Sequence, residues 1–259
     1  MKVFANILAI IVLIATIVAG KIYWDSNTSA APASQEKSTS DSSESKAVSG
    51  GSWESYTSNL PDSIVDKLAQ ASETGEPMNL MIVGSQAMSK DENSWPMLLK
   101  AELDKTYGSS LIDVTVYEYE GMNTLEFVRG NTYEDIVKAD PDVLLFEPFL
   151  LNDNGVVGIK NTLDNLSVIM SHITKEVDGV VTILQPSQPI YNATNYPKEA
   201  KELELFSKEN GYEYVDHWGS WPDYTSEEIL EYLSEDQRTL TDKGHKAWSE
   251  ALINYFVAS

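Results

Sequence analysis

The sequence predicts a three-layer α/β/α domain, in which helices cover both faces of a doubly wound, parallel, five-stranded sheet. Short apolar runs alternate with longer segments of helical periodicity from residue 62 to the C-terminus, which is the pattern of repeated strand–helix units. The run Asp142–Phe146 is apolar after its first residue, as expected of a strand buried on both faces. The chain holds 42% apolar residues, which is ample for a core.

The first half of this domain is predicted from apolar spacing and from helix-start residues. Ile64, Val65 and Leu68 recur at helical spacing, and Pro96 suits the first turn of a helix. An apolar run that ends at Gly84 indicates a buried strand. In chain order we expect a helix at 62–71, a strand at 80–83, a helix at 95–107, a strand at 111–119, and two helices within 124–138.

The second half repeats the alternation. Pro197 and Gly211 bracket a helical segment, in the usual order of proline at the start and glycine after the end. In chain order we expect strands at 142–146, 180–184 and 212–215, and helices at 163–177, 197–210, 226–233 and 241–256. Five strands result in total, all followed by a helix.

The N-terminal segment predicts a membrane anchor. Val3–Gly20 is nearly all apolar, and Lys21, Tyr23 and Trp24 follow it, as is typical of a membrane–water interface. Roughly 20 apolar residues suffice to cross a bilayer. We therefore expect a transmembrane signal anchor over residues 1–24, with a cleaved signal peptide as the alternative. The anchor implies a single-pass cell-membrane protein with an extracytoplasmic C-terminal domain, and cleavage implies a secreted one.

Residues 25–52 are dominated by Ser, Ala, Glu, Lys and Gly. Such a composition has too little apolar surface to offset the entropy of ordering, so we expect a disordered linker. The folded domain is expected to span residues 53–259.

Composition excludes several classes of function. The net charge of −22 argues against nucleic acid as a partner, because nucleic acid requires a basic surface. The absence of cysteine excludes disulfides and thiolate catalysis. No metal-binding motif and no glycine-rich phosphate loop is present, so we expect neither a metal nor a cofactor.

Polar residues follow the predicted strands at the points where the strands end. Ser85, Gly121 and Asn152 come after the first, second and third strands. The carboxyl ends of parallel strands share one edge of the sheet, where ligands bind. A nucleophilic serine needs a base and donors aimed at the developing oxyanion. The N–H groups of Ser85 and Gly121 and the side chain of Asn152 are three candidate donors.

This order of blocks resembles the SGNH, or GDSL-like, hydrolase family. The matching pieces are Trp95–Leu99, Asn152 with Asp153, and Thr241–Trp248. The resemblance implies a flavodoxin-like sheet and a serine hydrolase of acyl or acetyl esters. By the same resemblance, Ser85 is the nucleophile, and Gly121 and Asn152 hold the oxyanion.

The first block departs from the family. It usually reads Gly-Asp-Ser, whereas this chain has Val83-Gly84-Ser85. Aligning Gly84 with the family glycine places Gln86, instead of Ser85, at the nucleophile position. For an active enzyme Ser85 is the better choice, because glutamine offers no nucleophile. The third block has Leu150 where the family has glycine.

The last block departs further. If Gly244 is the glycine of the final helix, Asp236 takes the aspartate position and Thr239 takes the histidine position. By spacing alone, Asp242 and His245 also form an Asp-x-x-His motif at the start of that helix.

His217, at the end of the fifth predicted strand, is the alternative base or a residue that packs among tryptophans. Glu147, at a strand end, is interpreted as a loop residue or as an ion-pair partner of Arg129 or Arg238, and a carboxylate pair with Asp153 for glycoside chemistry is the weaker alternative.

The sequence therefore predicts a membrane-tethered extracytoplasmic serine esterase of SGNH type. Ser85 would attack an ester and form an acyl-enzyme, with His245 as the base and Asp242 orienting it. The substrate would be an acylated small molecule or a cell-envelope glycan. The alternative is a catalytically silent binding or scaffold module with the same fold, motivated by Thr239 and by the altered first block.

Overall fold

The computed structural model describes residues 53–258. The predicted transmembrane anchor and the linker lie outside these residues. Within residues 53–258, no helix combines the length and the apolar character needed to cross a membrane.

The centre of the domain is a sheet of five parallel strands in the order β2-β1-β3-β4-β5. Leu80 of β1 lies beside Val114 of β2 and Val143 of β3, so β1 has a partner on each side. The strands are β1 (Met78–Gly84), β2 (Ile112–Glu118), β3 (Val143–Phe146), β4 (Val181–Leu184) and β5 (Glu213–Tyr214). All five predicted strands are present, and β5 has only two residues.

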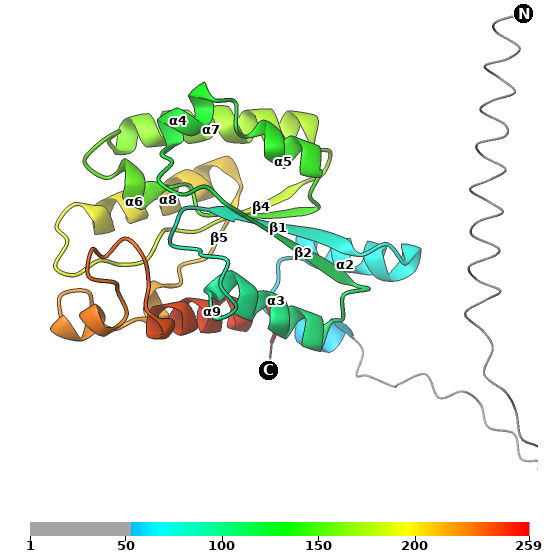
Figure 1. Cartoon of the computed structure of the whole chain (residues 1–259). Coiled ribbons are helices and arrows are strands. Elements are labelled where there is room, and N and C mark those ends of the chain that lie inside the picture. The colour runs from blue at the N-terminus through cyan, green and yellow to red at the C-terminus, as the bar shows by residue number, and fades with distance from the viewer. Residues whose placement is uncertain (1–52, 259) are drawn as a thin grey trace, which may run out of the picture. The chain divides into compact units, whose positions relative to one another are not determined.

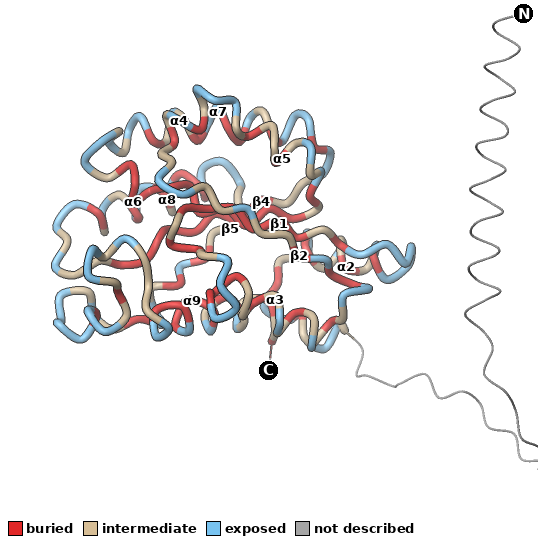
Figure 2. The backbone as a smooth tube through the Cα atoms, in the orientation of Figure 1, coloured by how far each residue is buried: buried red, intermediate tan, exposed pale blue. Residues whose placement is uncertain are grey.

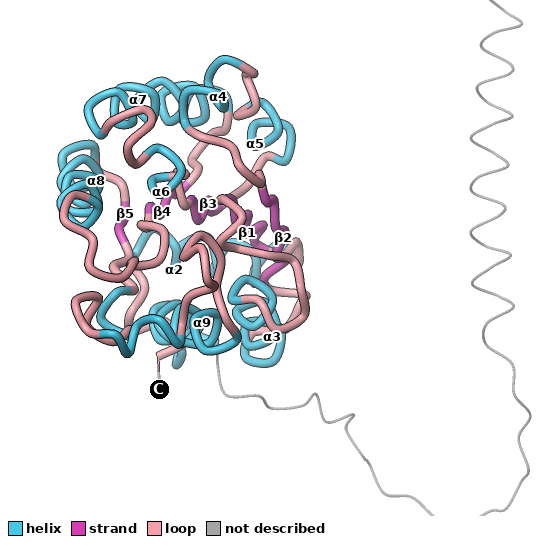
Figure 3. Tube along the Cα trace, turned by 60° about the vertical axis from the view of Figure 1, so that its left-hand side comes forward, coloured by secondary structure: helices cyan, strands magenta, loops and turns pink. Residues whose placement is uncertain are grey.

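Helices cover both faces of this sheet, as Figures 1 and 3 show. One layer holds α2 (Asp62–Thr74), α3 (Trp95–Thr106) and α9 (Asp242–Phe256). The other layer holds α4 (Thr124–Arg129), α5 (Glu134–Ala139), α7 (Ile159–Glu176) and α8 (Tyr196–Asn210). The three-layer, doubly wound prediction is confirmed.

The core has two parts because successive side chains of a strand point to opposite faces. Leu80 and Ile82 of β1 join the part under α2, α3 and α9, whereas Met81 and Val83 join the part under α4, α5, α7 and α8. Figure 2 shows the central strands β1, β3 and β4 as mostly buried between helices whose outer sides are exposed. Burial on both faces explains why the central strands are almost entirely apolar.

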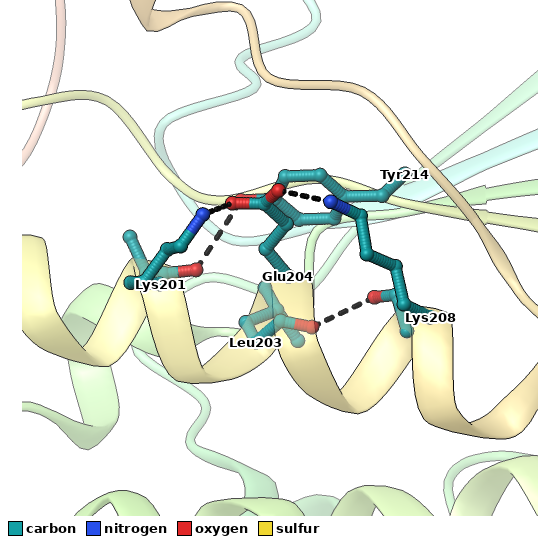
Figure 4. A network of polar contacts seen from close by, with 7 residues as sticks. Lys201, Leu203, Glu204, Lys208 and Tyr214 are labelled. Atoms are coloured by element: carbon teal, nitrogen blue, oxygen red, sulfur yellow. Dashed lines mark hydrogen bonds and ion pairs between the residues drawn. The ribbon is translucent and has the colours of Figure 1, made fainter.

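Helix α8 illustrates how a helix of the layer formed by α4, α5, α7 and α8 is held against the sheet. Figure 4 shows the carboxylate of Glu204 between the ammonium groups of Lys201 and Lys208, at 2.6 and 2.5 Å. Exposed pairs of this kind contribute little to stability. The helix is held mainly by its buried face, which includes Leu203. The hydroxyl of Tyr214 in β5 also donates to the carbonyl of Ala200.

Three segments differ from the prediction. Helix α7 begins at Ile159, after Gly158 at a φ of +80°, and not at residue 163. The segment predicted as a helix at 226–233 is a 3₁₀ helix, Glu227–Glu231. A one-turn helix, α6 (Leu150–Asp153), follows Phe149, whose φ is +59°. Local turn geometry, which apolar periodicity does not report, decides all three.

Candidate functional site

The loops after β1, β2 and β3 meet at the carboxyl edge of the sheet. Gln86 follows β1, Gly121 follows β2, and Asn152 lies in α6 after β3. Hydrogen bonds join these three residues, although 35 and 66 positions separate Gln86 from its two partners. The fold therefore brings two of the three predicted oxyanion donors to one point, whereas the third, the N–H of Ser85, donates to Glu147.

The side chain of Gln86 occupies that point. Its Oε1 accepts from the N–H of Gly121 at 3.1 Å and from Nδ2 of Asn152 at 3.0 Å. Its Nε2 donates to Oδ1 of Asn152 at 2.8 Å. The two donors expected to hold an oxyanion thus hold the carboxamide oxygen of Gln86.

Further hydrogen bonds hold Asn152 and its neighbour Asp153 in place. Its Nδ2 also donates to the carbonyl of Met122 at 2.8 Å. The next residue, Asp153, is 1% exposed and accepts from the N–H of Thr124 at 2.8 Å and from the hydroxyl of Thr162 at 2.6 Å. The bonds of Asp153 join α6 to α4 and α7. Together with the bond to Met122, they hold the amide of Asn152 in one orientation.

Ser85 points into the protein. It is 2% exposed, and its N–H donates to Oε2 of Glu147 at 2.8 Å. Its Oγ accepts from the N–H of Ala87 at 3.4 Å. Gly84 allows this arrangement, because a Cβ there would lie 3.0 Å from Oε2 of Glu147 and 2.5 Å from Sδ of Met88.

Glu147 is the buried acid of the site. It is fully buried, and its hydrogen-bond partners in the described part of the chain are Ser85, Ser187 and the backbone of Leu150. The expected pairing with Arg129 or Arg238 is therefore wrong. Burial raises the pKa of the Glu147 carboxyl, although the hydrogen bonds oppose that shift. Glu147 ties the ends of β1, β3 and β4 together.

His245 supports the start of α3. Its Nδ1 accepts from the N–H of Trp95 at 3.2 Å, so the neutral ring carries its proton on Nε2. Burial lowers the pKa of His245, and the charge of Asp242 opposes that shift. Asp242 and His245 share no hydrogen bond within the described residues. Nε2 therefore carries a proton, whereas a general base would need an unprotonated Nε2 to accept the proton of a serine hydroxyl.

His217 is part of the core. Its ring is fully buried and stacks on Trp248, with centroids 4.1 Å apart. Nδ1 accepts from Nε1 of Trp221 at 3.0 Å, and Nε2 lies 2.9 Å from the carbonyl of Pro186. Burial lowers the pKa of His217 to about 3. Both ring nitrogens are engaged, and the ring is neutral at ordinary pH.

The last block matches the family in its glycine and departs in its histidine. Gly244 lies in the first turn of α9, where a Cβ would come within 2.2 Å of the carbonyl of Tyr232. Asp236 is exposed and accepts from the hydroxyl of Ser234 at 2.7 Å. The carbonyl of Thr239 accepts from the N–H of Ser234, and the N–H of Thr239 donates to Oγ of Ser234. Across residues 53–258, no hydrogen bond joins an imidazole to Ser85.

The structure thus assembles part of the predicted site. Gly121 and Asn152 converge, whereas Ser85, His245 and Asp242 do not form a linked triad in this structure. Sequence reasoning assigned Gln86 no role, although the alternative alignment of Gly84 already placed it at the nucleophile position. It also assigned Ser187 no role, and no local motif marks that residue.

Comparisons with known proteins place the fold. No family model matches the sequence, and no curated protein matches it. Solved structures do match. A protein of the G-D-S-L lipolytic family from Desulfitobacterium hafniense is similar over 69% of this chain and 99% of its own, with a TM-score of 0.56 and 14% identity.

Two further structures agree. The acetylxylan esterase Axe2 from Geobacillus stearothermophilus matches over 70% of this chain and 95% of its own, with a TM-score of 0.56 and 14% identity. The esterase EstA from Pseudoalteromonas matches over 68% and 95%, with a TM-score of 0.52 and 15% identity. The fold is that of the SGNH, or GDSL-like, hydrolases.

Proposed function

We propose that this protein is a catalytically silent binding module built on the SGNH fold. One observation carries the proposal: the carboxamide of Gln86 fills the place where Gly121 and Asn152 would hold an oxyanion. A glutamine cannot attack an ester, and its oxygen takes both donors that a tetrahedral intermediate would need.

The surroundings of Ser85 support the same proposal. A serine becomes nucleophilic when an adjacent base takes its proton. The N–H of Ser85 is bound to the buried Glu147, and both candidate histidines serve other partners. For hydrolysis through Ser85, the serine side chain would have to turn toward solvent. A histidine ring would also have to move within hydrogen-bond distance of its hydroxyl.

Ester hydrolysis by Ser85 is the second candidate function. It is favoured by the convergence of Gly121 and Asn152 and by the names of the structural neighbours, which include an acetylxylan esterase. In this case His245 would be the base, Asp242 would orient it, and the substrate would be an acylated glycan or small molecule.

For either function, we propose that the N-terminal segment tethers the domain to the outer side of the cell membrane. The proposal rests on the apolar run Val3–Gly20 and the interfacial residues after it. A tethered domain would meet the polymers of the cell envelope. Fractionation of cells that express the full chain, with protease added from outside, tests this placement.

The deciding experiment measures turnover of an activated acetyl ester by the full chain. Binding without catalysis predicts no turnover above that of Ser85→Ala, and no covalent labelling of Ser85 by a phosphonate. Turnover that is lost in both Ser85→Ala and His245→Ala would establish the esterase and remove the silent module. His172→Gln, on the far helix α7, is the matched histidine control.

A further inference from the structure

We infer that Gly121 and Asn152 form a site for a primary carboxamide, and that Gln86 is its internal ligand. The inference rests on the proposed binding function and names the chemistry of the ligand. An external carboxamide would enter when the side chain of Gln86 swings out.

The site presents two hydrogen-bond donors and one acceptor. The donors are the N–H of Gly121 and Nδ2 of Asn152, which both reach Oε1 of Gln86. The acceptor is Oδ1 of Asn152, which receives Nε2 of Gln86 at 2.8 Å. A ligand that satisfies all three places has a carbonyl oxygen and an N–H on the same side, as a primary carboxamide has.

The orientation of Asn152 makes this pattern selective. Because Nδ2 also donates to the carbonyl of Met122, the amide of Asn152 cannot turn over without losing that bond. Oδ1 is therefore held toward the ligand. A carboxylate or an ester would satisfy the two donors, but its second oxygen would face Oδ1, an acceptor against an acceptor. The site thus disfavours esters.

The site is open enough for exchange. Gly121 is exposed, at a φ of +67°, and a Cβ there would meet nothing within 4 Å. Gln86 is partly exposed and lies in the loop after β1. Its side chain can leave by rotation about its own bonds, without movement of a strand or helix.

The first test removes the internal ligand. Gln86→Gly and the wild-type chain are titrated with acetamide, acetate and methyl acetate, while the NMR signals of the Gly121 amide and the Asn152 side chain are followed. We expect Gln86→Gly to bind acetamide at least about tenfold more tightly than acetate or methyl acetate, because one hydrogen bond is replaced by a clash of acceptors. The wild-type chain should bind acetamide more weakly than the variant, because Gln86 competes.

Several results would overturn the inference. Acetate or methyl acetate binding as tightly as acetamide would remove the selectivity, and equal acetamide affinity in both chains would remove the competition by Gln86. No acetamide binding to a Gln86→Gly chain that keeps the wild-type spectrum elsewhere would remove the site. Asn152→Ala in the same background should abolish the acetamide shifts.

A second test needs no external ligand. Gln86→Glu exchanges the donor Nε2 for an oxygen, so the ionised variant should unfold at lower urea than the wild type at pH 7. Protonation of the glutamate restores a donor, so the deficit should shrink toward pH 4. Gln70→Glu, exposed on α2, is the matched control. An equal effect of both substitutions, or a deficit that does not change with pH, would contradict the carboxamide site.

Different results would refute the silent binding module and the carboxamide site. Ester turnover by the wild-type chain would refute the silent module, whatever acetamide does. Failure of acetamide to bind selectively would refute the carboxamide site and leave a silent module with another ligand.

Discussion

Acidification should destabilise the domain through His217. The ring is buried between Trp248 and Trp221, and both nitrogens are bonded. Its pKa falls from 6.5 to about 3 on folding, because burial disfavours the charged ring. Between these two values the unfolded chain binds a proton that the folded chain does not. The stabilisation is complete above pH 6.5 and is lost as the pH falls toward 3.

The size of this effect follows from the two pKa values. At about 1.4 kcal/mol per pH unit, the free energy of unfolding should fall by about 1 kcal/mol at pH 5.5 and by about 3 kcal/mol at pH 4.5, relative to pH 7.5. His245, whose pKa is also lowered, adds a loss of the same sign. The loss is steep enough to be measured by urea unfolding at four pH values.

The variant His217→Phe tests the assignment. Phenylalanine keeps a ring against Trp248 but has no proton to bind, so its loss of stability on acidification should be smaller than that of the wild type by about the amounts above. It should also be less stable at pH 7.5, since Nε1 of Trp221 loses its partner. Equal slopes for wild type and His217→Phe would refute the reasoning.

Three further outcomes are expected. The pKa of Glu147 is raised by burial, so its contribution to stability is present below pH 4.5 and is lost as the pH rises through the folded value; because the wild type also gains stability over this range through His217, urea unfolding at pH 5 and pH 8 should show Glu147→Gln gaining more stability, or losing less, than the wild type. Gly244→Ala places a Cβ 2.2 Å from the carbonyl of Tyr232, so it should lower the free energy of unfolding by about 2 kcal/mol or more, whereas Gly219→Ala, which meets nothing within 4 Å, should change it little. Trp248→Ala removes a fully buried ring and should cost about 3–5 kcal/mol in urea unfolding; a cost below 1 kcal/mol would contradict its place in the core.

The convergence of Gly121 and Asn152 could be predicted from the sequence alone. Each was predicted from its position after a strand, and the two meet because parallel strands end at one edge of a sheet. The apolar runs of the central strands and the helical spacing of Ile64, Val65 and Leu68 likewise predicted elements that are present. These features are local, so the sequence states them directly.

The roles of Gln86, His217 and Glu147 depended on tertiary contacts. Which side chain after β1 bonds to Gly121 and Asn152 depends on partners 35 and 66 residues away. Whether a histidine is a base or a core residue depends on which rings cover it, and His217 is covered by Trp248. The amino-acid order by itself determined the layers and the edge where a site would form. Only the packing of distant loops decided that a carboxamide fills that site, because hydrogen-bond partners and burial are properties of the folded chain.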